Sequence, residues 1–231
     1  MKILGIIPAR IGSKSLRFKN IKSFNGKPLI YWTIKSAKES KLDKVIVSTD
    51  SKRIRKISKK YKCDAPFLRS KNISNDTAKG IQVMRHAITF YEKKNIFFDA
   101  IMLLQPTCPF RTKKDINQAI NLIKKNKADS VISLVDVEGY HPSRMKFINR
   151  NRIINPSFAE QKENIRRQDL KKVYLRSGLI YLVKTNTLKR NSLVGKLSVP
   201  LITPKNRSFN IDTKLDFELA ELYMKHIFKI N

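Results

Sequence analysis

The sequence predicts an α/β fold with three layers, in which helices cover both faces of a mostly parallel central sheet. Short apolar runs rich in β-branched residues, typical of buried strands, alternate with longer amphipathic segments, typical of helices. Such alternation is typical of βαβ units, whose helices cover the sheet. The length of 231 residues suits one substantial domain, and a hydrophobic fraction of 41% is enough to fill its core.

The first part of the chain predicts two strands around one helix. The run at 3–7 has the length and β-branched content of a buried strand. Pro8 ends it, because a proline cannot donate a hydrogen bond to a central ladder. Pro28 stands at a helix start, and apolar residues at helical spacing follow it over 29–39. A second buried strand is expected at 45–47.

Three further helices and two further strands are expected before residue 136. The segment 52–60 is a basic helix that turns isoleucines inward, and 76–92 is a long helix with one apolar face. Buried strands at 100–104 and 130–135 flank a helix at 113–126. The loops after the four strands should meet at one edge of the sheet, where ligands bind in such folds.

The pattern changes between residues 138 and 176, where periodicity is weak and polar residues are frequent. A structureless stretch of this length inside a compact domain is improbable, so we expect a functional segment or an interface. Residues 145–148 and 152–154 are expected to pair as a small hairpin across 149–151. The chain then resumes regular elements, with strands at 173–183 and 197–202 and a closing amphipathic helix at 213–228.

Composition limits the location and the partners. The net charge of +31 makes an anionic partner reasonable. However, the lysines are spread over the whole length and no aromatic-interleaved RNA motif is present, which argues against nucleic acid as the main partner. Cys63 and Cys108 match no metal-ligand spacing and fit a reduced cytoplasm. Without a signal-peptide pattern or a membrane-spanning run, we expect a cytoplasmic protein that does not enter the membrane.

The loop after the first strand is the first candidate site. A glycine lets the backbone come close to a ligand, and surrounding amides and cations suit a polyphosphate. The loop matches neither the Walker A pattern nor G-x-G-x-x-G. An ordinary solvated loop in a lysine-rich protein is the alternative interpretation. The loop carries four cations around Gly12 and Ser13, namely Arg10, Lys14, Arg17 and Lys19.

The opening stretch IPARIGSKSLRFKN at 7–20 resembles the amino-terminal signature, roughly A-R-x-G-S-K-G-x-x-x-K-N, of the cytidylyltransferases that make CMP-sialic acid and related CMP-nonulosonates. Five further motifs recur in the order of this acylneuraminate cytidylyltransferase family. They are VSTD at 47–50, NDTAKG at 75–80, LLQPTCPFR at 103–111, RRQDLKKVYLRSGLIY at 166–181 and NIDTKLDFELAE at 210–221.

The resemblance spans nearly the whole chain. It implies a Rossmann-like nucleotidyltransferase fold with a mixed sheet, in which residues 1–231 form one domain and 138–176 form an insertion that makes a homodimer. It also implies transfer of CMP from CTP to the anomeric hydroxyl of an acidic nine-carbon sugar, with release of pyrophosphate. Catalysis of such a transfer is mainly positioning and electrostatics, aided by Mg²⁺ or Mn²⁺.

The resemblance implies roles for named residues on the nucleotide side. Phosphate oxygens would be held by Arg10, Ser13, Lys14 and Lys19, with Lys19 at the α-phosphate. Asn20 would contact the nucleoside, and Arg69 would lie near the cytosine. For any one of the lysines, a solvated surface charge is the alternative interpretation.

On the sugar side, the resemblance implies that Gln105 and Arg167 contact the acceptor. A polar residue that merely ends a strand is the alternative for Gln105. Two prolines should hold its loop rigid. Cys108, where the family usually has serine, is expected to be a small packed side chain rather than a nucleophile, because this chemistry needs no covalent intermediate.

Asp212 is the most informative carboxylate. The family binds Mg²⁺ with an Asp-x-Asp pair at this place, but here the pair reads Asn210-Ile211-Asp212. An amide oxygen is still a ligand for Mg²⁺ but brings no charge, so the metal should bind more weakly. A helix N-cap is the alternative role for Asp212, because 213–216 resembles a capping box. The resemblance thus implies Arg10, Lys19 and Asp212 as the catalytic residues, and the base that activates the sugar hydroxyl would be either metal-bound water or Asp212.

Three other functions stay open. An enzyme for the eight-carbon acid KDO would need an opening loop like P-A-R-x-x-S-T-R-L-P, which this chain lacks. A scaffold protein on the same fold stays possible because of Asn210, and a basic nucleic-acid binder because of the net charge.

Overall fold

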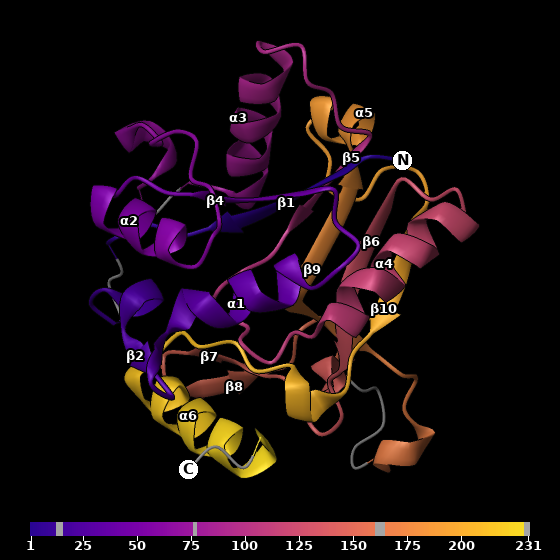
Figure 1. Cartoon of the computed structure of the whole chain (residues 1–231). Coiled ribbons are helices and arrows are strands. Elements are labelled where there is room, and N and C mark those ends of the chain that lie inside the picture. The colour runs from indigo at the N-terminus through magenta and orange to yellow at the C-terminus, as the bar shows by residue number, and fades with distance from the viewer. Residues whose placement is uncertain (13–15, 76–77, 160–164, 229–231) are drawn as a thin grey trace.

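A six-stranded mixed sheet forms the centre of the computed structural model, which describes residues 1–12, 16–75, 78–159 and 165–228 (Figure 1). Its strands are β1 (Ile3–Pro8), β4 (Lys44–Ser48), β5 (Ala100–Leu103), β6 (Ser130–Asp136), β9 (Tyr174–Lys184) and β10 (Ser198–Ile202). They lie in the order β10-β6-β9-β5-β1-β4. Strand β9 runs antiparallel to β5 and β6, whereas the other neighbours pair in parallel.

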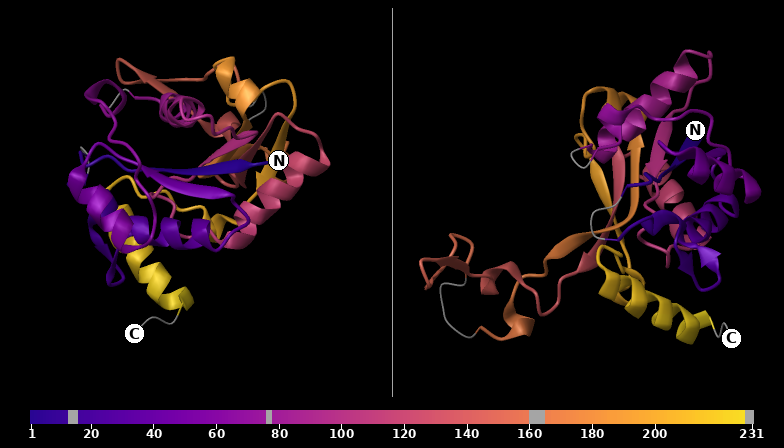
Figure 2. Two further views of the ribbon diagram at one scale, coloured as in Figure 1. Left: turned by 45° about the horizontal axis from the view of Figure 1, so that its top comes forward. Right: turned by 90° about the vertical axis from the view of Figure 1, so that its left-hand side faces the viewer.

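Helices cover both faces of the sheet and complete three layers (Figure 2). One face packs against α1 (Leu29–Lys38), α2 (Lys52–Lys60) and α4 (Lys113–Lys125), and the other against α3 (Gly80–Glu92) and α5 (Thr185–Lys189). Alternation within β1 supplies both cores, because Ile3 and Ile7 join the first and Leu4 and Ile6 join the second. The predicted three-layer α/β/α fold with a mostly parallel, mixed sheet is confirmed.

A third, smaller core joins the two ends of the chain. The last helix, α6 (Lys214–Phe228), lies outside the three layers and is yellow at the bottom of Figure 1. It packs Phe217 and Met224 against Phe24 and Phe110, and the rings of Phe24 and Phe217 meet edge to face at 5.2 Å. This core holds the C-terminal motif beside the opening loop and the loop after β5.

Most predicted elements are confirmed, with ends that differ by one residue at most. The helix predicted at 76–92 is wrong at its start, since α3 begins at Gly80. Of its predicted first residues, 76 and 77 lie outside the described part of the chain. Lys79 is extended, and its backbone N–H donates to Gln82 Oε1 at 2.8 Å, so the helix is capped there.

Among the α-helices and strands of the described residues, α5 and a hairpin of β2 (Ser23–Phe24) and β3 (Lys27–Pro28) have no counterpart in the prediction. The turn residues of the hairpin, Asn25 and Gly26, have φ of 49° and 71°. Asn-Gly is the strongest short-range sequence signal for a hairpin, because both residues readily adopt positive φ angles. The sequence therefore did contain the signal for this hairpin.

Residues 137–159 and 165–173, which we call the arm, lie between β6 and β9 in the sequence and project away from the three layers (Figure 2, right). The arm contains the predicted hairpin, formed by β7 (Phe147–Asn149) and β8 (Arg152–Ile154), although β7 begins two residues later and ends one residue later than the predicted 145–148. Its strands expose large apolar side chains, among them Ile148 and Ile153. In the described part of the chain, no helix combines the length and apolar character needed to cross a membrane.

Candidate nucleotide site

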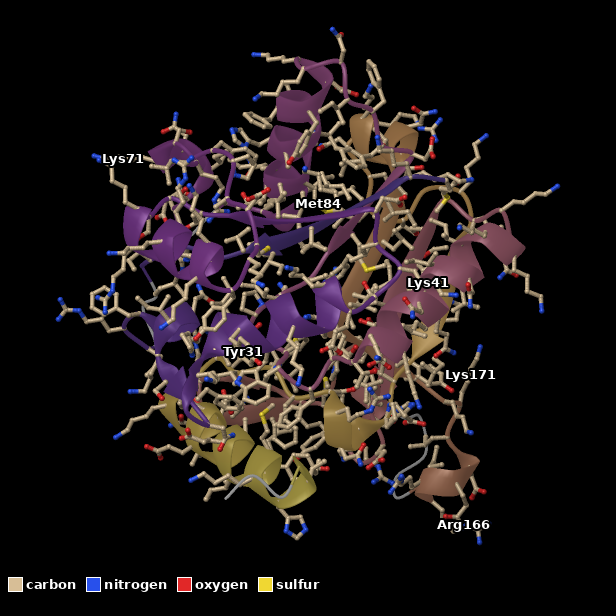
Figure 3. All side chains as sticks on the ribbon, in the orientation of Figure 1. Tyr31, Lys41, Lys71, Met84, Arg166 and Lys171 are labelled. Atoms are coloured by element: carbon tan, nitrogen blue, oxygen red, sulfur yellow. The ribbon has the colours of Figure 1, made fainter. Side chains whose placement is uncertain are left out.

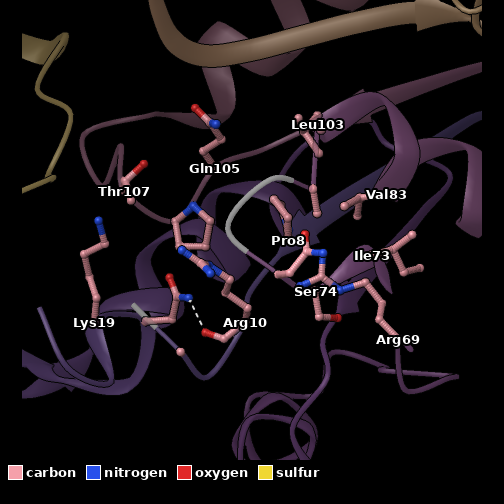
Figure 4. Close-up of a pocket in the computed structure, with 16 residues that line it drawn as sticks. Pro8, Arg10, Lys19, Arg69, Ile73, Ser74, Val83, Leu103, Gln105 and Thr107 are labelled. Atoms are coloured by element: carbon pink, nitrogen blue, oxygen red, sulfur yellow. Dashed lines mark hydrogen bonds between the residues drawn. The ribbon is translucent and has the colours of Figure 1, made fainter. Parts of the chain in front are cut away.

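A cavity of about 260 Å³ opens at the carboxyl ends of β1 and β5 (Figure 4). Three segments that are distant in the sequence, 8–20, 69–83 and 103–107, contribute to it. Its polar lining residues are Arg10, Lys19, Asn20, Arg69, Ser74, Asn75, Gln105 and Thr107. The structure therefore brings together five of the predicted site residues at the sheet edge where the parallel strands predicted a ligand.

The opening loop is fixed by bonds to its own backbone and to the neighbouring strand. Asn20 donates from Nδ2 to the carbonyl oxygen of Arg10 at 2.9 Å, the dashed line in Figure 4. The backbone N–H of Ile11 donates to Asp50 Oδ1, also at 2.9 Å. Asp50 ends the VSTD motif and had no predicted role. Ser13 and Lys14 lie outside the described residues.

Arg69 gives the cavity a buried positive charge. Its side chain is buried, and its backbone N–H donates to the carbonyl of Thr49 at 2.8 Å. Burial lowers the pKa of the guanidinium, Asp50 opposes this, and Arg10 lowers it further. Arg69 Nε finds no hydrogen-bond acceptor among the described residues. A buried donor of this kind is costly unless a ligand or water satisfies it, and an anion suits two neighbouring guanidinium groups.

The loop after β5 is held rigidly by Arg111, a residue that had no predicted role. Arg111 is buried, and it donates from Nη2 to the carbonyl of Gln105 at 2.8 Å and from Nε to that of Leu179 at 2.6 Å. Gly178 has a φ of +78°, and a Cβ there would lie 2.9 Å from Gln105 Oε1. Glycine at 178 thus leaves room for the Gln105 side chain.

Cys108 is a packed side chain, as predicted. It is fully buried, and its thiol donates weakly to the carbonyl oxygen of Ser177 at 3.7 Å. Burial raises the pKa of this thiol, so the reactive thiolate is disfavoured.

The opening loop and the C-terminal motif meet at Lys19. Its Nζ donates to the carbonyl of Ile211 at 2.7 Å and lies 3.6 Å from Asp212 Oδ1. The backbone N–H of Ile211 donates to the carbonyl of Thr107 at 2.9 Å. Lys19 is therefore oriented by backbone that is itself anchored to the loop of Gln105.

The first turn of α6 tests the alternative N-cap role of Asp212. Thr213 and Asp216 form the capping box, with Asp216 N–H donating to Thr213 Oγ1 at 3.1 Å and Thr213 N–H to Asp216 Oδ2 at 2.7 Å. The Asp212 carboxylate does not cap this turn, since it contacts Lys19 and accepts from Asn210 Nδ2 at 2.6 Å. The alternative N-cap role is thereby excluded.

The donor set around Asp212 fits a divalent cation only in part. Asp212 is exposed, which leaves room for a metal, but Asn210 turns its amide N–H groups toward it and its oxygen toward the Cys108 thiol. The described residues contain no group of three His, Cys, Asp or Glu side chains placed to hold a metal ion. Mg²⁺ is commonly bound by one or two carboxylates plus substrate phosphates, and this arrangement suits that mode.

Arg167 does not line the nucleotide cavity of its own chain. It lies exposed in a short 3-10 helix of the arm, Arg167–Asp169. There it lines a different cavity of about 440 Å³ at the root of the arm, with His141 and Lys171. Arg167 and Gln105 therefore line different cavities within one chain.

A three-layer α/β fold with a cationic cavity at the carboxyl ends of its parallel strands defines a nucleotide-binding α/β protein. A family model described as cytidylyltransferase matches residues 4–226. The chain therefore belongs to the cytidylyltransferase family.

Relatives with named activities agree with this assignment. The chain is 33% identical to a CMP-N,N'-diacetyllegionaminic acid synthase of Legionella pneumophila over 229 residues, which covers 97% of both chains. It is 34% identical to a pseudaminic acid cytidylyltransferase of Campylobacter jejuni, again over 97% of each. It is 33% identical to an N-acylneuraminate cytidylyltransferase of Escherichia coli, over 95% of this chain and 51% of that protein.

Solved structures agree on the fold. A CMP:2-keto-3-deoxy-manno-octonic acid synthetase complexed with CTP superposes with a TM-score of 0.74 at 16% identity, covering 98% of this chain and all of the other. A 4-diphosphocytidyl-2C-methyl-D-erythritol synthase superposes with a TM-score of 0.68 at 14% identity, covering 96% and 98%.

Proposed function

We propose that this protein transfers CMP from CTP to the anomeric hydroxyl of a nonulosonic acid of the sialic, legionaminic or pseudaminic type and releases pyrophosphate. The proposal rests above all on the contact of Lys19 with Ile211 and Asp212, which joins the opening motif to the C-terminal motif beside Gln105. Relatives that make CMP-linked acids of these types support the choice of acceptor.

The cations of the cavity suit the triphosphate of CTP. In this proposal Arg10, Ser13, Lys14 and Lys19 hold phosphate oxygens, and Lys19 stabilises the charge that develops at the α-phosphate. Groups already fixed in place are effective for this purpose because they need no reorganisation during the reaction. Asn20 and Arg69 would hold the nucleoside, with the unsatisfied Nε of Arg69 as a donor for it.

Mg²⁺, or Mn²⁺, is part of the same proposal. The carboxylate of Asp212 and the amide oxygen of Asn210, after a turn of the amide, would hold it together with phosphate oxygens. When bound, such a cation neutralises phosphate charge and polarises the phosphorus centre. Asp212 also orients Lys19 by their ion pair, which does not depend on the metal.

The acceptor side of the site is proposed to be completed by a second copy of the chain. Gln105 would bind the sugar from within one chain, and Arg167 would reach it from the arm of the partner. The exposed apolar residues Ile148 and Ile153 support a dimer through the arm, because a monomer gains nothing by exposing them. The proposal places the reaction in the cytoplasm, where CTP is available.

The test is pyrophosphate release from CTP and Mg²⁺ with each of three acids, namely N-acetylneuraminic, legionaminic and pseudaminic acid, with KDO as the comparison acceptor. We expect turnover with at least one of the three and the weakest turnover with KDO. Absence of turnover with all three would overturn the proposal, and preference for KDO would reassign the acceptor.

A further inference from the structure

A second cavity, of about 680 Å³, lies on the other side of the loop that carries Gln105. We call it the α1 groove, because α1 forms one wall with Tyr31 and Trp32. The first turn of α4, at Lys113, and Met224 of α6 form other parts of its wall. Figure 3 labels Tyr31 on α1, with α6 below it and α4 to its right. None of the residues that line this groove lines the nucleotide cavity.

Aromatic rings give the α1 groove an apolar wall. The rings of Tyr31 and Trp32 meet edge to face, with centroids 5.3 Å apart and planes at 77°, and both side chains are only partly buried. The Trp32 indole is held in place, since its Nε1 donates to the carbonyl of Phe24 at 3.1 Å. Fully buried Phe110 lies beneath. Fixed, partly exposed rings of this kind are suited to stack on a planar group.

Positive charge surrounds these rings. Four lysines line the groove, and Glu39 is the one carboxylate among its lining residues. Beneath them lies Arg111, whose hydrogen-bond acceptors in the described part of the chain are all neutral. They are the carbonyls of Leu179 and Gln105 and the hydroxyl of Thr33. The nearby carboxylate of Asp115 is engaged by Arg207. A buried cation without a direct counter-ion favours an anion in the adjoining space.

We infer that the α1 groove is a second ligand site, distinct from the nucleotide cavity, for a molecule that joins a planar ring to a negatively charged group, such as a nucleoside monophosphate. The ring would stack on Tyr31, beside the Trp32 indole that meets Tyr31 edge to face, and the anion would lie among Lys27, Lys35 and Arg111. Since Arg111 also holds the carbonyl of Gln105, the site is linked to the loop that borders the nucleotide cavity. The residues that line this second site are different from those that line the nucleotide cavity of the proposed function.

Trp32 is the only tryptophan of the chain, so its fluorescence reports directly on the groove. The probe is CMP titrated into the full-length protein without CTP or acceptor, with inorganic pyrophosphate as a probe that has the charge but no ring. We expect a saturable change in Trp32 emission with CMP below about 1 mM and a weaker response to pyrophosphate.

Two variants locate the signal. Lys35→Glu should weaken CMP binding about fivefold by reversing one charge, and Tyr31→Ala about tenfold by removing a stacked ring. Lys56→Glu, which makes the same charge change on the exposed side of α2, is the matched control and should leave binding unchanged. Circular dichroism of each variant checks that it is folded.

A saturable change that Lys35→Glu and Tyr31→Ala weaken, and Lys56→Glu does not, supports the site. No saturable change, or the same affinity in Lys35→Glu as in Lys56→Glu, overturns it. Neither result depends on turnover, so failure of this inference is distinguishable from failure of the proposed function.

Discussion

Lys19 Nζ lies 3.6 Å from Asp212 Oδ1. It also donates a hydrogen bond to the carbonyl oxygen of Ile211, which precedes Asp212 and stands 192 positions after Lys19 in the sequence. The lysine side chain is largely buried and the aspartate exposed, so the pair points a fixed cation into the cavity while the carboxylate faces solvent. Because this contact joins the two ends of the chain at the nucleotide cavity, the predictions begin with it.

Replacing the cation should remove most of the activity. Lys19→Met is expected to lower kcat/KM for CTP about 10²- to 10³-fold, the usual effect of losing one group that stabilises transition-state charge. Lys22→Met is the matched control, because Lys22 is an exposed cation that does not line the cavity. Steady-state kinetics at saturating acceptor measure the difference, and equal rates in the two variants would remove Lys19 from the reaction.

Asn210→Asp should strengthen the response to Mg²⁺ and weaken the protein without it. Two carboxylates would face each other where an amide now donates to Asp212, so we expect the free energy of unfolding in EDTA to fall by about 0.5–1 kcal/mol. Mg²⁺ should restore it, and the half-saturating Mg²⁺ concentration should fall about tenfold. Thermal unfolding with and without Mg²⁺ measures the first effect. Asn206→Asp, in the same exposed stretch, is the control, and identical Mg²⁺ responses in the two variants would argue against a metal at 210–212.

Gly178→Ala should disturb Gln105. A Cβ at this positive φ would lie 2.9 Å from Gln105 Oε1 and 3.2 Å from Cys108 Sγ, so the free energy of unfolding should fall by about 1–3 kcal/mol. If Gln105 binds the acceptor, the KM for the sugar should rise more than the KM for CTP. Gly139→Ala is the control, because a Cβ at Gly139 has open space around it. An unchanged sugar KM in a folded Gly178→Ala protein would contradict the role of Gln105.

Asp115 links stability to pH. Burial by itself raises the pKa of its carboxyl, but hydrogen bonds from Arg207 and Thr112 outweigh burial and leave it below the ordinary value. A carboxyl whose pKa is lower in the folded state stabilises the protein above its unfolded-state pKa of about 3.9, and this contribution is lost as the pH falls through the folded-state pKa. Asp115→Asn should therefore cost about 2 kcal/mol at pH 7 and progressively less below pH 4. Urea unfolding of the wild-type protein and the variant at pH 7 and below pH 4 measures this cost. The same difference in the free energy of unfolding at the two pH values would refute the linkage.

The arm should hold a dimer together. Ile148→Glu is expected to convert a dimer to a monomer, because it places a charge on an apolar surface. Leu222→Glu, an equally large change at an exposed position of α6, should leave the dimer intact. Light scattering after gel filtration measures the mass. A wild-type monomer, or a dimer that survives Ile148→Glu, would contradict this interface and with it the access of Arg167 to a neighbouring site.

Local sequence patterns were sufficient to predict most of the helices and strands, but they did not predict the contacts between distant residues. The β-branched runs and apolar periodicities are signals within a dozen residues, so strands and helices were predicted to within one residue at nearly every end. The predicted start of α3 was wrong because two starts looked equally suitable in the sequence. One was the acidic residue at 76, and the other was the cap that the Gln82 side chain makes with the backbone of Lys79. No local pattern shows that Asp50 holds Ile11 or that Arg111 holds Gln105, because these bonds depend on how the strands are ordered in the sheet.

The candidate site shows the same division. Lys19, Asn20, Arg69 and Gln105, which the motifs singled out, line one cavity. The motifs indicated the capping box at 213–216, but they could not show that the Asp212 carboxylate lies against Lys19, because that contact joins distant parts of the chain.

The most direct test of the account is mass spectrometry of the product that wild-type protein makes from CTP, Mg²⁺ and an equimolar mixture of N-acetylneuraminic, legionaminic and pseudaminic acids. The account predicts a product whose mass is that of CMP joined to one of these acids, formed together with pyrophosphate and nearly absent with Lys19→Met. CTP left intact by a folded, Mg²⁺-loaded wild-type protein, or consumed without any CMP-linked acid, would contradict it.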